Sequence, residues 1–223
     1  MQNARTVGAP VNGRRLAALA AGAVCIDRYE VSVWSSPAGG TQYGASSDDY
    51  PCDDDGQDCG DIYARSVAGV TPSRFITWFQ AQQALANVGK RLPTNAEWQQ
   101  AVAGTPDSAA CNVSTGAVAN TGANAACISA HGAYDMVGNL AEWVGDWDEQ
   151  ALGCTTWPAD FGSDLTCLGR ADGEASTRFP AALLRGGNGV FGFGGGTAAG
   201  PFAVNGDSQP SASVSIIGFR GTR

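Results

Sequence analysis

Cysteine is the residue type whose spacing in this chain suggests chemistry most directly. Six of the seven cysteines form pairs that are close in sequence, and each pair brackets a stretch rich in small and polar residues: Cys52/Cys59, Cys111/Cys127 and Cys154/Cys167. We expect three disulfides, which form in an oxidising compartment or in a thermophilic cytosol. Cys25 lies in the apolar run 23–26, so we expect it to be buried in a strand and unpaired.

A metal cluster is the alternative interpretation of these cysteines. Structural zinc sites commonly use Cys-x-x-Cys pairs, and the chain has none. His131 is the single histidine, so it would have to supply every imidazole ligand of a metal and the base of any Ser/His/Asp triad. We therefore favour disulfides over zinc and a structural role for His131.

Other enzyme signatures are also missing from the sequence. There is no Gly-x-Ser-x-Gly elbow, and the glycine-rich residues 192–196 lack the lysine of a phosphate-binding P-loop. The acidic run 53–58 resembles a calcium loop but lacks the terminal glutamate of an EF-hand, so a solvated loop is the better interpretation. The sequence predicts no catalytic cofactor.

The charge of the chain excludes one class of partner. The net charge is −8 and the isoelectric point is about 4.5, with a single lysine, Lys90. Nucleic-acid binding needs clustered Lys and Arg to release counterions, so we expect no nucleic-acid partner. No run of about 20 apolar residues occurs, so we expect no membrane insertion.

The helices and strands that position these residues are predicted from the spacing of apolar residues and from capping and glycine residues at their ends. We expect an N-terminal strand and linker over residues 1–22 and a single domain over 23–223. Alternation predicts a strand over 24–34, followed by a long surface loop over 35–61. Apolar spacing predicts a helix over 75–88, and a Thr94/Glu97 capping box begins a second helix that ends before Gly104. Short strands and loops after residue 105 complete an α+β class.

Tryptophans are expected to anchor the core of this domain. Trp98 and Val102 are four residues apart and lie on one face of the second helix. Trp78 and Trp143 are likewise interpreted as core anchors in preference to ligand-stacking residues.

Several segments together resemble a known family. They are CIDRYEV (25–31), GKRLPTNAEW (89–98), GAYDMVGNLAEWV (132–144), RGG (185–187) and GFR (218–220). This pattern, which spans about residues 24–220, is similar to the formylglycine-generating-enzyme (sulfatase-modifying-factor) family, a subgroup of the C-type lectin fold. The resemblance implies two helices, short β-strands and many ordered loops.

The residues that carry catalysis in that family are missing. Members that oxidise a substrate cysteine bind copper with two cysteines between the Arg-Gly-Gly and Gly-Phe-Arg motifs. The chain has no cysteine between Gly187 and Gly218, so a soft thiolate site cannot form there. Ergothioneine-type relatives hold iron with several histidines, whereas this chain has only His131. We therefore expect a binding protein and not an enzyme.

The C-terminal segment resembles the variable region of a diversity-generating-retroelement protein. The fixed landmarks of such regions match AGPFA (199–203), Pro210-Ser211 and IGFR (217–220), which places the variable region at about 185–220. In these proteins adenines of a template copy are randomised, so Asn-type codons change but never yield Lys, Glu, Trp or Met. Residues 188–217 contain none of those four, whereas Gln209 lies outside the reachable set.

The residues between these landmarks are the candidate ligand-binding positions. They are expected to form one exposed patch on a rigid scaffold: Asn188, Val190, Phe191, Phe193, Thr197, Asn205, Asp207, Ser208, Ala212, Val214 and Ile216. The partner would be a protein or another surface ligand. We expect this chain to come from a bacterium or phage and to act in an oxidising environment, at the cell surface or on a virion, with a thermophilic cytosol as the alternative. In one alternative, Phe191 and Phe193 pack inside the domain and the neighbouring glycines form a flexible loop. Another makes the chain an inactive relative with a structural or carbohydrate-binding role.

The family resemblance also implies a structural calcium. The matching positions are Asp135, the carbonyls of Gly138 and Leu140, and Glu142, whose hard oxygen atoms suit calcium. The alternative is that Asp135 and Glu142 cap turns, and the sequence leaves the two readings open.

Overall fold

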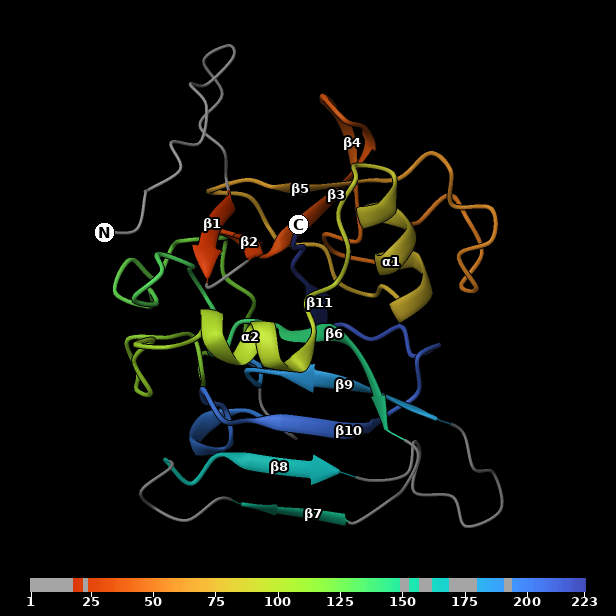
Figure 1. The fold of residues 1–223 in the computed structure, drawn as a ribbon. Coiled ribbons are helices and arrows are strands. Elements are labelled where there is room, and N and C mark those ends of the chain that lie inside the picture. The colour runs from red at the N-terminus through yellow and green to blue at the C-terminus, as the bar shows by residue number, and fades with distance from the viewer. Residues whose placement is uncertain (1–17, 22–23, 149–152, 157–161, 169–179, 191–193) are drawn as a thin grey trace, which may run out of the picture.

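Three sheets and two helices build the fold of this computed structural model, which describes residues 18–21, 24–148, 153–156, 162–168, 180–190 and 194–223 (Figure 1). A two-stranded sheet pairs β1 (Ala18–Ala21) with β2 (Val24–Asp27). A three-stranded sheet has the order β4–β3–β5, from Gly39–Tyr43, Val31–Ser36 and Tyr63–Ser66.

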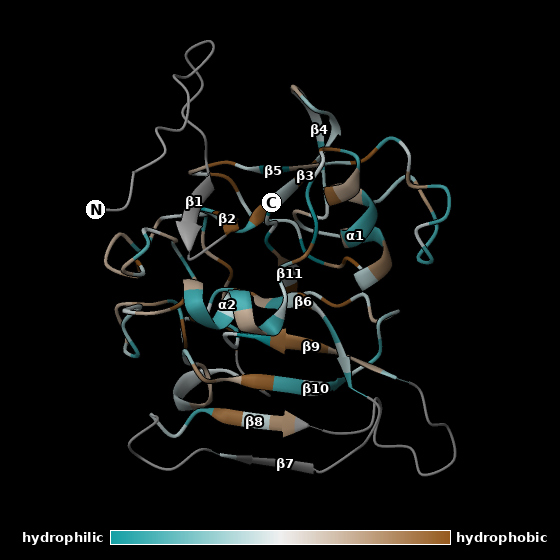
Figure 2. Ribbon diagram, in the orientation of Figure 1, coloured by the Kyte–Doolittle hydropathy of each residue, from teal (hydrophilic) through white to brown (hydrophobic). Residues whose placement is uncertain are grey.

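The six-stranded sheet carries the C-terminal half of the chain. Its order is β11–β6–β9–β10–β8–β7, with parallel pairing at β11/β6 and β10/β8 and antiparallel pairing elsewhere. The strands are β6 (Ala141–Asp148), β7 (Gly153–Thr156), β8 (Leu165–Leu168), β9 (Ala181–Arg185), β10 (Val204–Ser208) and β11 (Ile217–Phe219). Figure 2 shows that β9 is hydrophobic until it ends at Arg185, whereas β10 turns hydrophilic beyond Val204.

Both predicted helices form, and both begin at capping boxes. Helix α2 (Asn95–Ala101) is capped by Thr94 with Glu97, as predicted. Helix α1 (Trp78–Ala86) is shorter than the predicted 75–88, because Thr77 caps it with Gln80 and Phe75 has a φ of 56°. A positive φ is incompatible with a right-handed helix, so the helix cannot begin at Phe75.

The single strand predicted over 24–34 is wrong. The chain bends after β2, and Glu30 becomes fully buried, where its carboxylate accepts from the Leu140 N–H (3.0 Å) and from the Asn139 amide. These contacts satisfy a buried acid, and they separate β2 from β3. The long loop predicted over 35–61 is also interrupted, by β4.

Two apolar clusters form the core on either side of the six-stranded sheet. Trp143 belongs to the cluster beneath α1, and Trp98 belongs to the cluster beneath α2. Both are fully buried, as predicted, and Val102 lies beside Trp98. Trp78 is only half-buried and packs at the edge of the first cluster, so the prediction that it is a core anchor holds only in part.

Two of the predicted disulfides, Cys52–Cys59 and Cys111–Cys127, are present. Cys167 is also disulfide-bonded, and Cys154 is its partner position across the β7/β8 ladder, although the Cys154 side chain lies outside the described residues. Cys25 is unpaired, as predicted, but it is exposed; it pairs with Ala20 of β1 and exchanges backbone hydrogen bonds with Arg223. The prediction that Cys25 is buried is therefore wrong.

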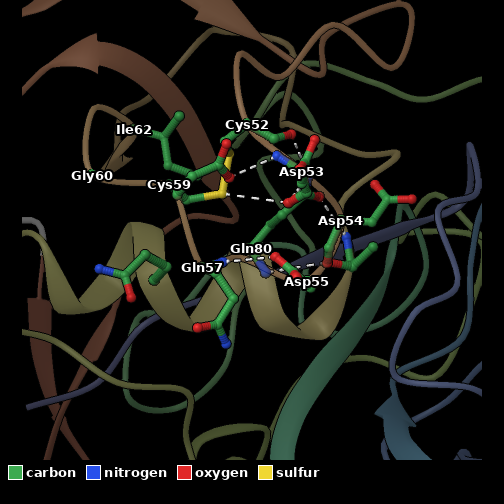
Figure 3. The surroundings of a disulfide bond; sticks show 12 residues. Cys52, Asp53, Asp54, Asp55, Gln57, Cys59, Gly60, Ile62 and Gln80 are labelled. Carbon is green, nitrogen blue, oxygen red and sulfur yellow. Dashed lines mark hydrogen bonds between the residues drawn. A yellow bond between two sulfur atoms is a disulfide. The ribbon is translucent and has the colours of Figure 1, made fainter.

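The Cys52–Cys59 disulfide closes the acidic loop against α1 (Figure 3). Gln80, inside the helix, donates to the carbonyls of Cys52 and Asp53, and the Thr77 hydroxyl donates to the Asp54 carbonyl at 2.6 Å. Asp53, Asp54 and Asp55 remain exposed. The loop is thus fixed through its backbone and presents its carboxylates to solvent, as expected of a solvated acidic loop.

No helix in the described part of the chain has the length and apolar character that a membrane crossing requires.

Candidate ligand-binding groove

A groove of about 170 Å³ opens on the six-stranded sheet beside the C-terminal segment. Its scaffold walls come from four strands of the sheet, through Ala141 of β6, Leu165 of β8, Leu184 of β9 and Ile217 of β11. Strand β10 and the segment before β11 supply the rest. The walls are largely apolar, and among the described residues Asp207 is the only charged one that lines the groove.

Six of the predicted ligand-binding residues line this groove: Asn188, Asn205, Asp207, Ser208, Val214 and Ile216. They come from the Arg-Gly-Gly turn, from β10 and from the segment before β11. Positions up to 28 residues apart in the sequence (188 to 216) therefore meet at one place.

The other five predicted positions are distributed differently. Thr197 is exposed, Val190 and Ala212 are half-buried, and none of these three lines the groove. Phe191 and Phe193 lie outside the described residues. Asn188 is 1% exposed, so the expectation of an exposed side chain is wrong for this residue, whose Oδ1 accepts from the Val190 N–H at 3.0 Å.

The segment that borders the groove is held largely through its backbone. The Trp78 N–H donates to the Pro210 carbonyl (2.8 Å), the Phe75 N–H to the Val214 carbonyl (3.1 Å) and the Ala141 N–H to the Ile216 carbonyl (2.9 Å). The Arg74 guanidinium donates to the Ser215 carbonyl (3.2 Å). Backbone carbonyls are present whatever the side chain, so this segment keeps its course when its side chains change.

Steric limits account for the glycines among the fixed landmarks. A Cβ on Gly187 would lie 2.3 Å from the Gly194 carbonyl oxygen, and one on Gly218 would lie 2.7 Å from Leu140 Cδ1. A Cβ on Gly200 would lie 1.8 Å from the carboxylate of Asp164. Only glycine fits at these three positions without a shift of neighbouring atoms.

Two buried charged residues fix the landmark at 199–203. Arg185 is 4% exposed; its guanidinium lies 4.6 Å from the centre of the Trp98 ring and donates to the Pro201 carbonyl at 3.1 Å. Burial lowers the pKa of Arg185 to about 10. Asp164 is fully buried and accepts from the Phe202 N–H at 2.8 Å. Its pKa is raised to about 7, chiefly by burial.

The raised pKa of Asp164 gives a pH-dependent prediction for Asp164→Asn. Below the ordinary pKa of 3.8 the carboxyl of Asp164 is protonated in the folded and in the unfolded protein. Between about pH 4 and 7 it ionises in the unfolded protein but not in the folded one, and this difference lowers the free energy of unfolding of the parent. The amide oxygen of asparagine can still accept from Phe202. We expect the free energy of unfolding of the variant, relative to the parent, to increase by about 1–3 kcal/mol between pH 4 and pH 8. Urea unfolding at both pH values measures this, and a pH-independent difference would refute it.

Two of the four positions named for calcium, Glu142 and Asp135, have partners within the protein. Both carboxylate oxygens of Glu142 accept from buried Arg220 (2.7 and 2.9 Å to Nε), and one also accepts from Trp98 Nε1 at 2.7 Å. Asp135 Oδ2 accepts from the Gly122 N–H at 2.7 Å. The Arg220 guanidinium thus occupies the place beside Glu142 that a cation would need, so Glu142 does not fit calcium in this arrangement, and calcium binding at the other three positions stays a prediction.

The scaffold walls of the groove were missed by sequence reasoning. Leu165, Leu184 and Ile217 lie in short apolar runs that read as ordinary core strands. Their convergence depends on strand pairings between distant segments, such as Leu184 with Asn205 and Ile217 with Ala141. No local signal in the sequence encodes those pairings.

Comparison with known proteins identifies the class to which this fold and groove belong. Residues 24–223 match the family of sulfatase-modifying factor enzyme 1-like domains (FGE-sulfatase), and the chain belongs to that family. It is similar to a formylglycine-generating enzyme of Thermomonospora curvata, with 28% identity over 142 residues that cover 52% of this chain and 44% of that enzyme.

Solved structures share the fold over most of this chain. The P3c and M1 variants of the Major Tropism Determinant superpose with TM-scores of 0.59 and 0.58 at 22% identity, over 94% and 93% of this chain and 52% of theirs. At this identity the likeness shows the fold alone. The chain spans about half the length of the relatives it matches. The predicted α+β, C-type lectin fold of the formylglycine-generating-enzyme subgroup is confirmed.

Proposed function

We propose that this chain is a non-catalytic ligand-binding protein whose C-terminal groove is diversified to recognise a protein or another surface ligand. The observation that carries the proposal is the convergence of six predicted variable positions on one groove. Residues of the fixed landmarks, in contrast, are buried, as Arg220 is, or sterically restricted, as Gly200 is.

The C-terminal segment is held in place by its backbone, whereas its side chains line the groove, and this arrangement supports the proposed function. Side chains that line the groove, such as Asp207 and Val214, can be exchanged, because the segment around them is anchored by carbonyls and by buried landmarks. A binding site diversified in this way needs a scaffold that tolerates many side chains at fixed backbone positions. The likeness to the Major Tropism Determinant variants agrees with such a scaffold.

An enzymatic role has less support in the residues of this chain. The family name points to cysteine oxidation. However, the chain has no cysteine between Gly187 and Gly218, and the described residues that line the groove offer aliphatic side chains, asparagines, a serine and one carboxylate. An inactive relative with a structural or carbohydrate-binding role remains the second candidate, favoured by the family membership.

We expect no copper-dependent oxidase activity. A peptide that carries a sulfatase-type cysteine motif, incubated with the protein, copper and oxygen, should keep its cysteine unchanged in mass spectrometry. An active formylglycine-generating enzyme serves as the positive control. Formation of formylglycine above the enzyme-free background would contradict a non-catalytic function.

Diversification is tested at the gene that encodes the chain. We expect a near-copy of its 3′ coding region, close to a reverse-transcriptase gene, that differs from it mainly at adenines. The differing codons should include those of Asn205, Asp207, Ser208, Val214 and Ile216. A locus without such a copy would leave the inactive relative as the better account.

A further inference from the structure

Two large hydrophobic side chains are exposed in the described part of the chain, Trp147 at 42% and Val214 at 40%. Val214 lines the groove, and its carbonyl accepts from the N–H of Phe75, just before α1. Trp147, near the end of β6, packs against Trp78 and Phe79 at the start of α1. Both exposed side chains thus adjoin the same stretch of scaffold.

Strand register places Trp147 on the face of the sheet that carries the groove. Trp147 pairs with Ala182 of β9, and Ala182 pairs with Ser208 of β10, a residue that lines the groove. Side chains of paired residues point to the same face. Strands β6, β9 and β10 are neighbours in the sheet (Figure 1). Trp147 therefore lies two strand spacings, or about 10 Å, from Ser208.

Trp147 is held in place by other aromatic side chains. Its ring meets Trp78 edge-to-face at 5.1 Å and Phe79 at 5.9 Å, and Trp78 Nε1 donates to the Val144 carbonyl at 2.9 Å. A rigid tryptophan contributes contact area at low entropic cost, and such residues dominate binding energy at protein interfaces. Trp147 also lies outside the variable region at 185–220, so it would be common to every variant.

The surroundings of Trp147 are acidic. The chain carries a net charge of −8, Asp207 lines the groove, and Asp48 accepts from Ser213 at the far side of the same segment. Arg74 lies beside that segment, and its guanidinium donates to the Ala45 and Ser215 carbonyls within the chain. Asp146 and Asp148, the sequence neighbours of Trp147, point to the opposite face of β6, where Asp146 accepts from the Asn95 N–H. A cationic side chain is the complementary partner for an exposed tryptophan in this field, since its charge is attracted to both the ring face and the carboxylates.

We infer that Trp147 is a fixed aromatic anchor at the rim of the groove, which receives an arginine or lysine side chain of a protein partner. The inference rests on the proposed function and adds to it a division of roles. Trp147 supplies affinity that all variants share, and the diversified residues select the partner.

The test uses binders obtained from the full chain by display. Thr197, Asn205, Asp207, Ser208, Val214 and Ile216 are randomised, and specific binders are selected separately on lysozyme and cytochrome c, two basic proteins. In each binder, Trp147→Ala should weaken binding at least tenfold. Trp147→Phe should retain more affinity than Trp147→Leu, because only phenylalanine keeps an aromatic face. Raising the NaCl concentration from 50 to 500 mM should weaken the parent binders.

Trp34→Ala is the matched control. Trp34 is half-buried in the separate three-stranded sheet, with the Arg65 guanidinium over its ring at 5.3 Å, and its replacement should leave binding within twofold. Circular dichroism and thermal melting identify any variant that loses its fold. Binders that keep their affinity in Trp147→Ala would overturn the anchor but leave the proposed function standing. A failure to select any binder would overturn both.

Discussion

Replacing Arg220 by methionine should lower the free energy of unfolding by about 3–5 kcal/mol, because it leaves the buried carboxylate of Glu142 without its cation. Arg220 is 0% exposed, binds Glu142 through Nε and also donates to the Asp27 carbonyl (3.1 Å) and the Tyr134 carbonyl (2.9 Å). Burial lowers the pKa of Arg220, but the ion pair and hydrogen bonds with Glu142, together with the nearby carboxylates of Glu30 and Asp135, outweigh this effect and the pKa is raised. Urea unfolding with the disulfides intact measures the loss.

The double variant Glu142→Gln/Arg220→Met separates loss of charge balance from loss of packing. Glutamine keeps an acceptor for Trp98 Nε1 and removes the unpaired charge, so the double variant should recover about 2 kcal/mol of the loss. If the double variant is no more stable than Arg220→Met, the ion pair is not what stabilises this part of the core.

Gly200→Ala should destabilise the domain by about 2–3 kcal/mol or more, although it adds one methyl group. The new Cβ would lie 1.8 Å from Asp164 Oδ1 and 2.1 Å from its carboxyl carbon, so buried Asp164 or the 199–203 landmark must move. Thermal melting and urea unfolding both report the effect.

Two further variants show whether this contact is the cause. Gly60→Ala, where no atom lies within 4 Å of the added Cβ, should change stability by no more than about 0.5 kcal/mol. Asp164→Ala should relieve the clash, so Gly200→Ala should cost less in that background than in the parent. An equal cost in both backgrounds would show that the carboxylate does not fix Gly200.

The sequence predicted those features of the fold that have local signals. The Thr94/Glu97 capping box located the start of α2, and short cysteine spacings predicted Cys52–Cys59 and Cys111–Cys127. Signals that depend on distant partners were misread. Alternation in residues 24–34 could not reveal that Glu30 turns inward towards Leu140, 110 residues away in the sequence.

The candidate site was predictable to a similar degree. The landmark spacing placed Asn205, Asp207, Ser208 and Val214 together, because fixed motifs at both ends limit where the segment can run. It could not distinguish Asn188, whose burial follows from its contacts with residues 190 and 194. It also gave no sign of Trp147, which the β6–β9–β10 pairing places on the same face of the sheet as the groove.

We expect the groove to bind ligands and its side chains to determine which ligand is bound. Two display libraries of the same size test it most directly. One randomises five residues that line the groove, together with Thr197 beside it: Asn205, Asp207, Ser208, Val214 and Ile216. The other randomises six exposed positions away from the groove: Ala86, Ala96, Gln100, Ala103, Ala109 and Ala125.

Both libraries are selected on the same panel of purified proteins, and the measurement is the number of distinct, target-specific binders that each library yields. We predict that the groove library yields binders to several targets, that these keep melting temperatures close to that of the parent chain, and that the other library yields few or none. Equal yields from the two libraries, or groove variants that unfold, would contradict the account.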